Sequence, residues 1–216
     1  MHCEKKQWHN MDHSFLYILL DYIGSLAFAI SGIRLAAARH FDLFGALVVG
    51  MVTAIGGGTI RDLLLDITPA WMTSPAYIII GTFALVWVII FRKQMVRQNN
   101  TWFLFDAIGL ALFTVTGMTK SIFAGFPLWV AIIMGTITGA AGGVLRDILL
   151  NEIPLIFRRD IYAMACVLGG LVFCGCMKLK FSIEVAAIAC GATVLATRLL
   201  AVKYHISLPV LKPEDK

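Results

Sequence analysis

The sequence repeats itself after 85 residues without a gap, and this repeat constrains the fold more than any other feature. The segment DYIGSLAFAISG, which begins at Asp21, aligns with DAIGLALFTVTG, which begins at Asp106. Of the 57 positions from Asp21 to Tyr77, 18 are identical in the second copy. Apolar segments often match by chance because they share few residue types. Rare charged residues that match at one fixed offset indicate a true internal repeat.

The repeated unit contains three apolar segments that are long enough to cross a bilayer, which takes about 20 residues. Seven such segments are predicted in all: 14–33, 41–67, 76–92, 103–120, 126–150, 160–177 and 182–202. Only 14% of the residues are charged, against about 25% in soluble domains, which favours a polytopic membrane protein. Because three is odd, the second copy must enter the membrane from the opposite side, which gives an inverted-topology repeat.

The predicted fold is therefore an all-α membrane protein with a 3+3 inverted-topology repeat and one additional helix. We expect a single transmembrane domain, 14–202, between an N-terminal tail, 1–13, and a C-terminal tail, 203–216. The domain divides into three parts: repeat one (14–92), repeat two (103–177) and the seventh helix (182–202).

The basic residues predict how the chain is oriented. The face that holds the N-terminus would carry Lys5, Lys6, Lys120, Lys178 and Lys180. The opposite face would carry twice as many: Arg34, Arg39, Arg92, Lys93, Arg97, Arg158, Arg159, Lys203, Lys212 and Lys216. The positive-inside rule then places the N-terminus outside and the C-terminus in the cytoplasm of a plasma or inner membrane.

The second and fifth segments combine glycines with charge. The stretch AIGGGTIRDLLLDITP, Ala54 to Pro69, aligns with GAAGGVLRDILLNEIP in the second copy. Glycine costs a helix up to about 1 kcal/mol relative to alanine, so both helices are predicted to kink or break there. The glycines concerned are Gly56, Gly57, Gly58, Gly142 and Gly143. Small residues at four-residue spacing also favour close helix packing, and we expect both uses.

Six charged residues are predicted to lie within the bilayer: Asp21, Arg61, Asp62, Asp106, Arg146 and Asp147. Each costs about 2.5–3.5 kcal/mol at the membrane centre, so each must pair or contact water. Adjacent helical residues do not face each other, so Arg61 should pair poorly with Asp62 and well with an acid on another helix. The candidates are Asp21, Asp106 and Asp147, and the same reasoning applies to Arg146.

Two arginines and four aspartates leave a surplus of two negative charges, which would favour cations over anions in a wet cavity. We therefore predict that these six residues line an ion pathway. The alternative is a set of purely structural ion pairs, a role that suits Arg61 and Arg146 best. Asp66, which aligns with Asn151, lies nearer the end of its segment and ranks below Asp62.

The sequence lacks the motifs that would indicate other functions. GGGTIRD does not end in the Gly-Lys-Ser/Thr of a phosphate-binding loop, and no HExxH or nucleophile-elbow pattern occurs. The five cysteines include no CxxC pair, and the basic residues form no block of the kind that binds nucleic acid. We expect no enzyme activity, no catalytic residue, no cofactor and no metal site.

With its two GG-x-x-RD segments, the sequence resembles the prokaryotic branch of the trimeric intracellular cation (TRIC) channel family, which also carries a glycine-transporter domain label. The most specific parts are GGGTIRD (Gly56–Asp62) and GGVLRD (Gly142–Asp147). The resemblance implies a homotrimer with a hydrophilic pore through each protomer. It also implies conduction of monovalent cations, mainly potassium and sodium, beside helices two and five, kinked at their glycines. Ala141 replaces the first glycine of the second copy, so the two bends need not be equal.

Two other functions remain open at the level of the sequence. A secondary transporter for a small amino acid such as glycine fits an inverted repeat at least as well as a channel does. A non-conducting scaffold fits the glycine packing but not the six charges. Unitary potassium currents would favour the channel, and saturable glycine uptake without such currents would favour the transporter.

Overall fold

The computed structural model describes residues 15–97, 101–157, 161–204 and 206. Helices account for nearly all of them, as the sequence predicts. In chain order the elements are α2 (Phe15–Ala38), α3 (Leu43–Leu64), α4 (Ala70–Thr73), α5 (Ala76–Arg97), α6 (Thr101–Phe123), α7 (Leu128–Leu149), the 3-10 helix η1 (Leu155–Phe157), α8 (Ala163–Lys178) and α9 (Ile183–Lys203). The N-terminal tail, most of the C-terminal tail, and the basic residues Arg158, Arg159, Lys212 and Lys216 lie outside the described residues.

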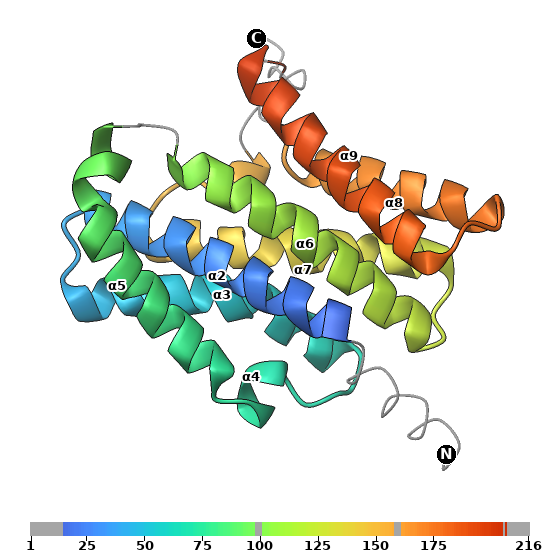
Figure 1. The fold of residues 1–216 in the computed structure, drawn as a ribbon, viewed down its shortest axis with the longest axis horizontal. Coiled ribbons are helices and arrows are strands. Elements are labelled where there is room, and N and C mark those ends of the chain that lie inside the picture. Colours follow the sequence, from blue (N-terminus) through green and yellow to red (C-terminus); the bar gives the residue numbers. More distant parts are fainter. Residues whose placement is uncertain (1–14, 98–100, 158–160, 205, 207–216) are drawn as a thin grey trace, which may run out of the picture.

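The two repeats pack against each other through their first two helices. Helix α2 contacts α6, and α3 contacts α7. In Figure 1, α2 and α6 run side by side with α3 and α7 behind them. Helix α5 packs on α2 and α3 at one side of the bundle, whereas α8 packs on α7 and on α9 at the other side.

Five helices are long and apolar enough to cross a membrane: α2, α3, α6, α7 and α9. The apolar parts of α5 and α8 are shorter, Ala76–Phe91 and Ala163–Lys178. Large apolar side chains such as Ile79 and Ile90 of α5 are exposed on the outside of the bundle, where lipid would cover them. The all-helical membrane fold is confirmed, and the count of seven crossings stays a prediction.

Helices α3 and α7 run without interruption through the glycines at 56–58 and 142–143. A break at these positions is therefore excluded. Lipid offers no partners for freed backbone groups, so an unbroken hydrogen-bond ladder is the stable solution where no wet cavity replaces it. A bend within each continuous helix stays a prediction.

The glycines instead allow α3 and α7 to cross with their backbones in contact. A Cβ atom on Gly57 would lie 2.1 Å from the carbonyl oxygen of Thr138, and one on Gly142 would lie 2.3 Å from that of Thr53. The two contacts are equivalent under the 85-residue offset. The packing role foreseen for glycine thus holds at this crossing.

The same turn ends α3 and α7. Asp66 and Asn151, which align in the repeat, both have positive φ angles, 56° and 55°. The amide of the residue that follows each one donates to the carbonyl five residues earlier, at 2.9 Å for Ile67 and 2.8 Å for Glu152. Asp and Asn tolerate this left-handed conformation better than other non-glycine residues do. The turn therefore explains why an acid in one copy is matched by an amide in the other.

This turn gives a direct prediction for Asp66. Asp66→Asn should leave stability unchanged, because Asn occupies the aligned position. Asp66→Val should lower the free energy of unfolding by about 1–2 kcal/mol, because a β-branched side chain opposes the left-handed conformation. Thermal unfolding in detergent compares the two variants. A loss of stability in Asp66→Asn that matches Asp66→Val would show that the carboxylate itself matters.

Candidate functional site

The charged residues of repeat one converge in a cluster formed by α2, α3 and α5. Arg61 Nε donates to Asp62 Oδ1 at 2.7 Å, and Arg61 Nη1 lies 3.9 Å from Asp21 Oδ1. The hydroxyl of Tyr77 donates to Asp21 Oδ2. All four residues are buried. We call this set, Asp21, Arg61, Asp62 and Tyr77, the first cluster.

Repeat two forms the same cluster at the same offset, from Asp106, Arg146, Asp147 and Tyr162. Arg146 Nη1 donates to Asp106 Oδ1 at 2.6 Å, and its Nε donates to Asp147 Oδ1 at 2.9 Å. The Tyr162 hydroxyl lies 3.5 Å from Asp106 Oδ1. We call this set the second cluster. All six predicted site residues therefore gather in two groups, each with a tyrosine that sequence reasoning did not single out.

The expected pairing is half confirmed. Each arginine does contact an acid on another helix, Arg61 through Asp21 and Arg146 through Asp106. The expectation that Arg61 pairs poorly with its neighbour Asp62 is wrong. The rule for adjacent residues concerns the directions of their Cβ atoms, whereas a guanidinium at the end of a long side chain can fold sideways to reach the next residue.

The second oxygen of each neighbouring aspartate holds the chain that returns after the helix. Asp62 Oδ2 accepts from the amide of Ala70 at 3.2 Å, at the start of α4. Asp147 Oδ2 accepts from the amide of Leu155 at 2.9 Å, at the start of η1. These two aspartates thus act as clamps between an arginine and a backbone amide.

One further basic residue joins each cluster. Lys120 Nζ of α6 lies 3.7 Å from Asp62 Oδ1 in the first cluster. Arg198 Nη2 of α9 lies 4.0 Å from Asp106 Oδ2 in the second. Each cluster therefore holds two acids and two bases, and the expected surplus of two negative charges is wrong. A signal for Arg198 was present, because it is an arginine within the apolar segment 182–202.

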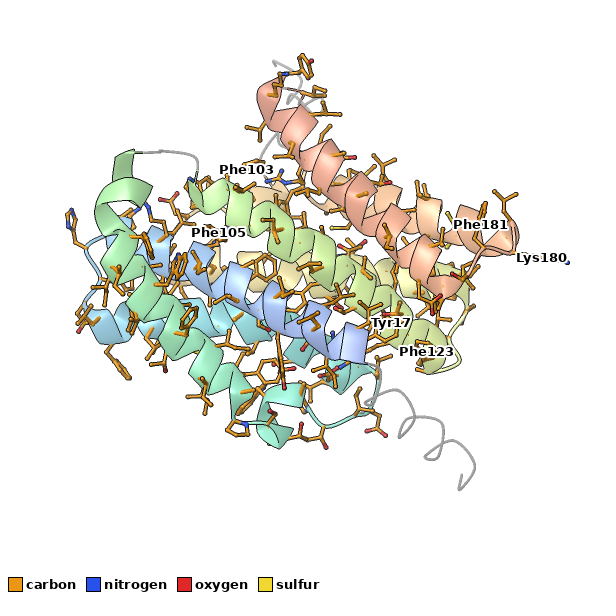
Figure 2. All side chains as sticks on the ribbon, in the orientation of Figure 1. Tyr17, Phe103, Phe105, Phe123, Lys180 and Phe181 are labelled. Carbon is orange, nitrogen blue, oxygen red and sulfur yellow. The ribbon has the colours of Figure 1, made fainter. Side chains whose placement is uncertain are left out.

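Arg198 is enclosed by aromatic rings. Its guanidinium carbon lies 4.9 Å from the centre of the Phe103 ring and 4.8 Å from that of Tyr162, distances typical of cation–π contacts. Its Nη1 donates to the carbonyl oxygen of Ile161 at 3.0 Å. Figure 2 shows Phe103 near the beginning of α6, on the side that faces α9. The seventh helix therefore takes part in the site.

Two cavities reach the clusters from opposite ends of α2 and α6. The first cavity, about 270 Å³, is lined by Asp21 and Tyr17 of α2, by the α4 region and by the last turns of α6, including Lys120. Tyr17 packs edge-on against Phe123 there, with ring centres 5.9 Å apart (Figure 2). The second cavity, about 200 Å³, is lined by Arg39, Trp102, Arg146, Asp147 and Glu152, among others.

Comparison with known families supports the repeat. A family model described as a glycine transporter matches residues 18–93 and again residues 103–178. Both boundaries of the second match lie 85 residues after those of the first. The family model thus finds the same two copies as the self-alignment.

Similar proteins are bacterial membrane proteins. The UPF0126 inner membrane protein YadS of Escherichia coli K12 is 40% identical over 200 residues, which cover 91% of this chain and 96% of that protein. A UPF0126 membrane protein of Vibrio cholerae is 40% identical over 205 residues, covering 92% and 84%. Among solved structures, the TRIC trimeric intracellular cation channel orthologue of Rhodobacter sphaeroides matches with a TM-score of 0.83 at 35% identity, covering 88% of this chain and 99% of that one.

Proposed function

This chain belongs to the family that the glycine transporter model describes, and we propose that it is a channel for monovalent cations, potassium and sodium. Each protomer of a homotrimer would hold one hydrophilic pathway. The observation that carries the proposal is the structural match to a TRIC cation channel over 99% of that protein's length. The same match favours a channel over an enzyme.

The pathway in this proposal begins at the first cavity and ends at the second. Each cavity borders one cluster, the first through Asp21 and the second through Arg146, so a cation would pass Asp21 and Arg61 and then Asp106 and Arg146. Of the two cross-helix acids, Asp21 is the one in reach of water, because its side chain is 11% exposed and that of Asp106 is fully buried. Asp21 is therefore our choice for the residue that attracts cations.

The other predicted site residues have supporting roles in the same proposal. Arg61 and Arg146 hold the acids in place, and Asp62 and Asp147 fix the return segments after α3 and α7. Lys120 contributes positive charge at the first cavity and opposes the attraction of Asp21 for cations.

Removing charge at the first cavity gives a test with two opposite outcomes. Asp21→Asn should lower the permeability of potassium relative to chloride severalfold, and Lys120→Gln should raise it. Asp106→Asn should change selectivity less, because Asp106 is sealed from water. Reversal potentials in planar bilayers under a potassium chloride gradient measure these ratios, with Asp66→Asn as the control. Unchanged selectivity in Asp21→Asn would remove Asp21 from the pathway.

A second candidate function uses the same cavity. Asp21 and Lys120 place an acid and an amine on one cavity wall, which suits the two charges of a small amino acid such as glycine. Single-channel recording beside uptake of labelled glycine into proteoliposomes separates the two functions. Unitary potassium currents without glycine support the channel. Saturable glycine uptake without such currents supports the transporter.

We propose the orientation on the distribution of basic residues. The protein is a multi-pass membrane protein with a single transmembrane domain, 14–202, its N-terminus outside and its C-terminus in the cytoplasm. Reporter fusions to each terminus test this topology, and a cytoplasmic signal from the N-terminal fusion would reverse it.

A further inference from the structure

The two clusters contain the same residues but are not packed equally. The contact between Arg146 and Asp106 is 2.6 Å, whereas the equivalent distance between Arg61 and Asp21 is 3.9 Å. The first cluster borders the first cavity through Asp21, but Asp106 is fully buried. The Asp21 carboxylate of repeat one is therefore loosely paired and borders the first cavity, whereas the Asp106 carboxylate of repeat two is tightly paired and does not line the second cavity, which borders Arg146 and Asp147 of its cluster.

The additional basic residues differ in the same way. The Lys120 side chain is 24% exposed, and that of Arg198 is 1% exposed. Arg198 comes from α9, which lies outside the repeat, and within the part of the chain that the structure describes no equivalent helix covers the first cluster. The Arg198 guanidinium packs on the rings of Phe103 and Tyr162, and it donates a hydrogen bond to the carbonyl oxygen of Ile161. The second cluster thus contacts a basic residue from outside the repeat, whereas the additional basic residue of the first cluster, Lys120, comes from repeat two.

A surface ion pair adds to this difference. Arg39, at the end of the α2 region, pairs with Glu152, which follows α7, and both residues line the second cavity. The equivalent positions in the other repeat are Ala124 and Ile67, which cannot form an ion pair. We call the Arg39–Glu152 ion pair the surface latch; it has no aligned counterpart at the first cavity, where Lys120 and Asp62 join the two repeats instead.

The seal around Arg198 is imperfect. Within the described residues, neither Arg198 Nε nor Asp106 Oδ2 has a hydrogen-bond partner, and Arg198 Nη2 lies 4.0 Å from Asp106 Oδ2. Buried polar groups without partners cost free energy. The second cluster is thus not fully satisfied, and Arg61 Nη1 of the first cluster likewise has no hydrogen-bond partner among the described residues.

We propose that Arg198 is a positioning residue that holds repeat two closed, and that this structure is the state in which water reaches Asp21 from the first cavity but does not reach Asp106 from the second. On opening, repeat two takes the geometry that repeat one already shows, so that Arg146 and Asp106 separate and water enters. The consequence for ion conduction rests on the proposed function, but the opening itself does not.

Thiol labelling tests whether Arg198 holds repeat two closed, a role that we call the lock. It requires no measurement of transport. Ser31 is fully buried, and its hydroxyl accepts a hydrogen bond from Arg146 Nη1 at 3.0 Å. A Ser31→Cys protein should react slowly with a charged methanethiosulfonate reagent, measured against the same protein without that cysteine. Adding Arg198→Met should speed the reaction by roughly tenfold, which corresponds to about 1.4 kcal/mol of lost closing free energy.

The controls separate a lock from a general loss of packing. Arg198→Lys should restore slow labelling because it keeps the positive charge, and Lys203→Met, on the same helix, should have no effect. Arg39→Gln changes only the surface latch and so avoids any folding defect of Arg198→Met; it should speed labelling by a smaller factor. Unchanged labelling in Arg198→Met and Arg39→Gln alike would overturn the proposal.

Current recordings then connect the lock to conduction. Arg198→Met should raise the open probability of the channel relative to Lys203→Met. If the wild-type protein carries no cation current and labelling still accelerates, the lock stands and the proposed function fails. If currents are present but neither labelling nor open probability responds to Arg198→Met, the proposed function stands and the lock fails.

Discussion

Arg146→Met is expected to destabilise the protein by about 3–5 kcal/mol, the usual cost of breaking a buried ion pair by removing one partner. Arg146 donates to Asp106, to Asp147 and to the hydroxyl of Ser31, and its side chain is fully buried. Methionine fills much of the space but leaves two carboxylates without their main partner. Thermal denaturation of the purified variant in detergent or lipid nanodiscs measures the loss of stability.

The aligned variant in repeat one provides the comparison. Arg61→Met should cost less, because Asp21 keeps its hydrogen bond from Tyr77 and borders a cavity, and Asp62 keeps Lys120 nearby. Adding Asp106→Asn to Arg146→Met should recover part of the stability, because one unpaired charge is removed. Equal losses in the two single variants would contradict the difference between the clusters.

Gly57→Ala and Gly142→Ala should each destabilise the protein by about 1–3 kcal/mol or more, the usual cost of overpacking. The new methyl groups would lie 2.1 and 2.3 Å from backbone oxygens of the opposing helix, which cannot move aside as a side chain can. The helices would have to separate at the crossing. Melting temperatures of the purified variants, compared with that of the wild-type protein, measure the loss of stability.

Gly58→Ala is the matched control for this prediction, since it adds the same methyl group one position along the same helix. The nearest atom to its Cβ is the end of the Arg61 side chain, at 3.5 Å, which is ordinary van der Waals contact. The substitution should be neutral or stabilise the helix by up to about 1 kcal/mol. A Gly58→Ala protein as unstable as Gly57→Ala would show that glycine is needed for a bend rather than for the crossing.

The repeat explains why so much of the site could be foreseen. Rare charged residues that match at a fixed offset led to both clusters, because equivalent positions in equivalent folds meet equivalent neighbours. The cross-helix pairs follow from the cost of lone charges in lipid. That argument gives Asp21, Asp106 and Asp147 as candidate partners of Arg61, and the fold selects Asp21 for Arg61 and Asp106 for Arg146.

Four residues of the two clusters could not be predicted from the sequence, for physical reasons. Arg198 lies outside the repeat, so the offset that revealed the other charges gives no hint of it. Lys120 stands near the end of α6, where a lysine commonly reaches the membrane surface, and only the fold shows that its side chain turns toward Asp62. Tyr77 and Tyr162 match in the alignment, but a tyrosine in an apolar segment has many uses. Single residues outside a pattern need tertiary contacts to reveal their role.

The uninterrupted α3 and α7 show how tertiary packing overrides local propensity. Glycine weakens an isolated helix, but at Gly57 and Gly142 the missing side chain lets two backbones meet, and that contact supports the helical conformation. Sequence alone does not distinguish a glycine that bends a helix from one that a neighbouring helix covers.

The crossing of α3 and α7 is the point about which one repeat would tilt against the other. It joins the two repeats by backbone contacts that map onto each other under the 85-residue offset, so it lies midway between the two clusters. When a repeat tilts about its middle, its two ends move in opposite directions. The four residues of each cluster lie within one repeat, so a small tilt of one repeat about Gly57 and Gly142 would act on the contacts between repeats. It would shorten one of the ion pairs Lys120–Asp62 and Arg39–Glu152 as it lengthens the other.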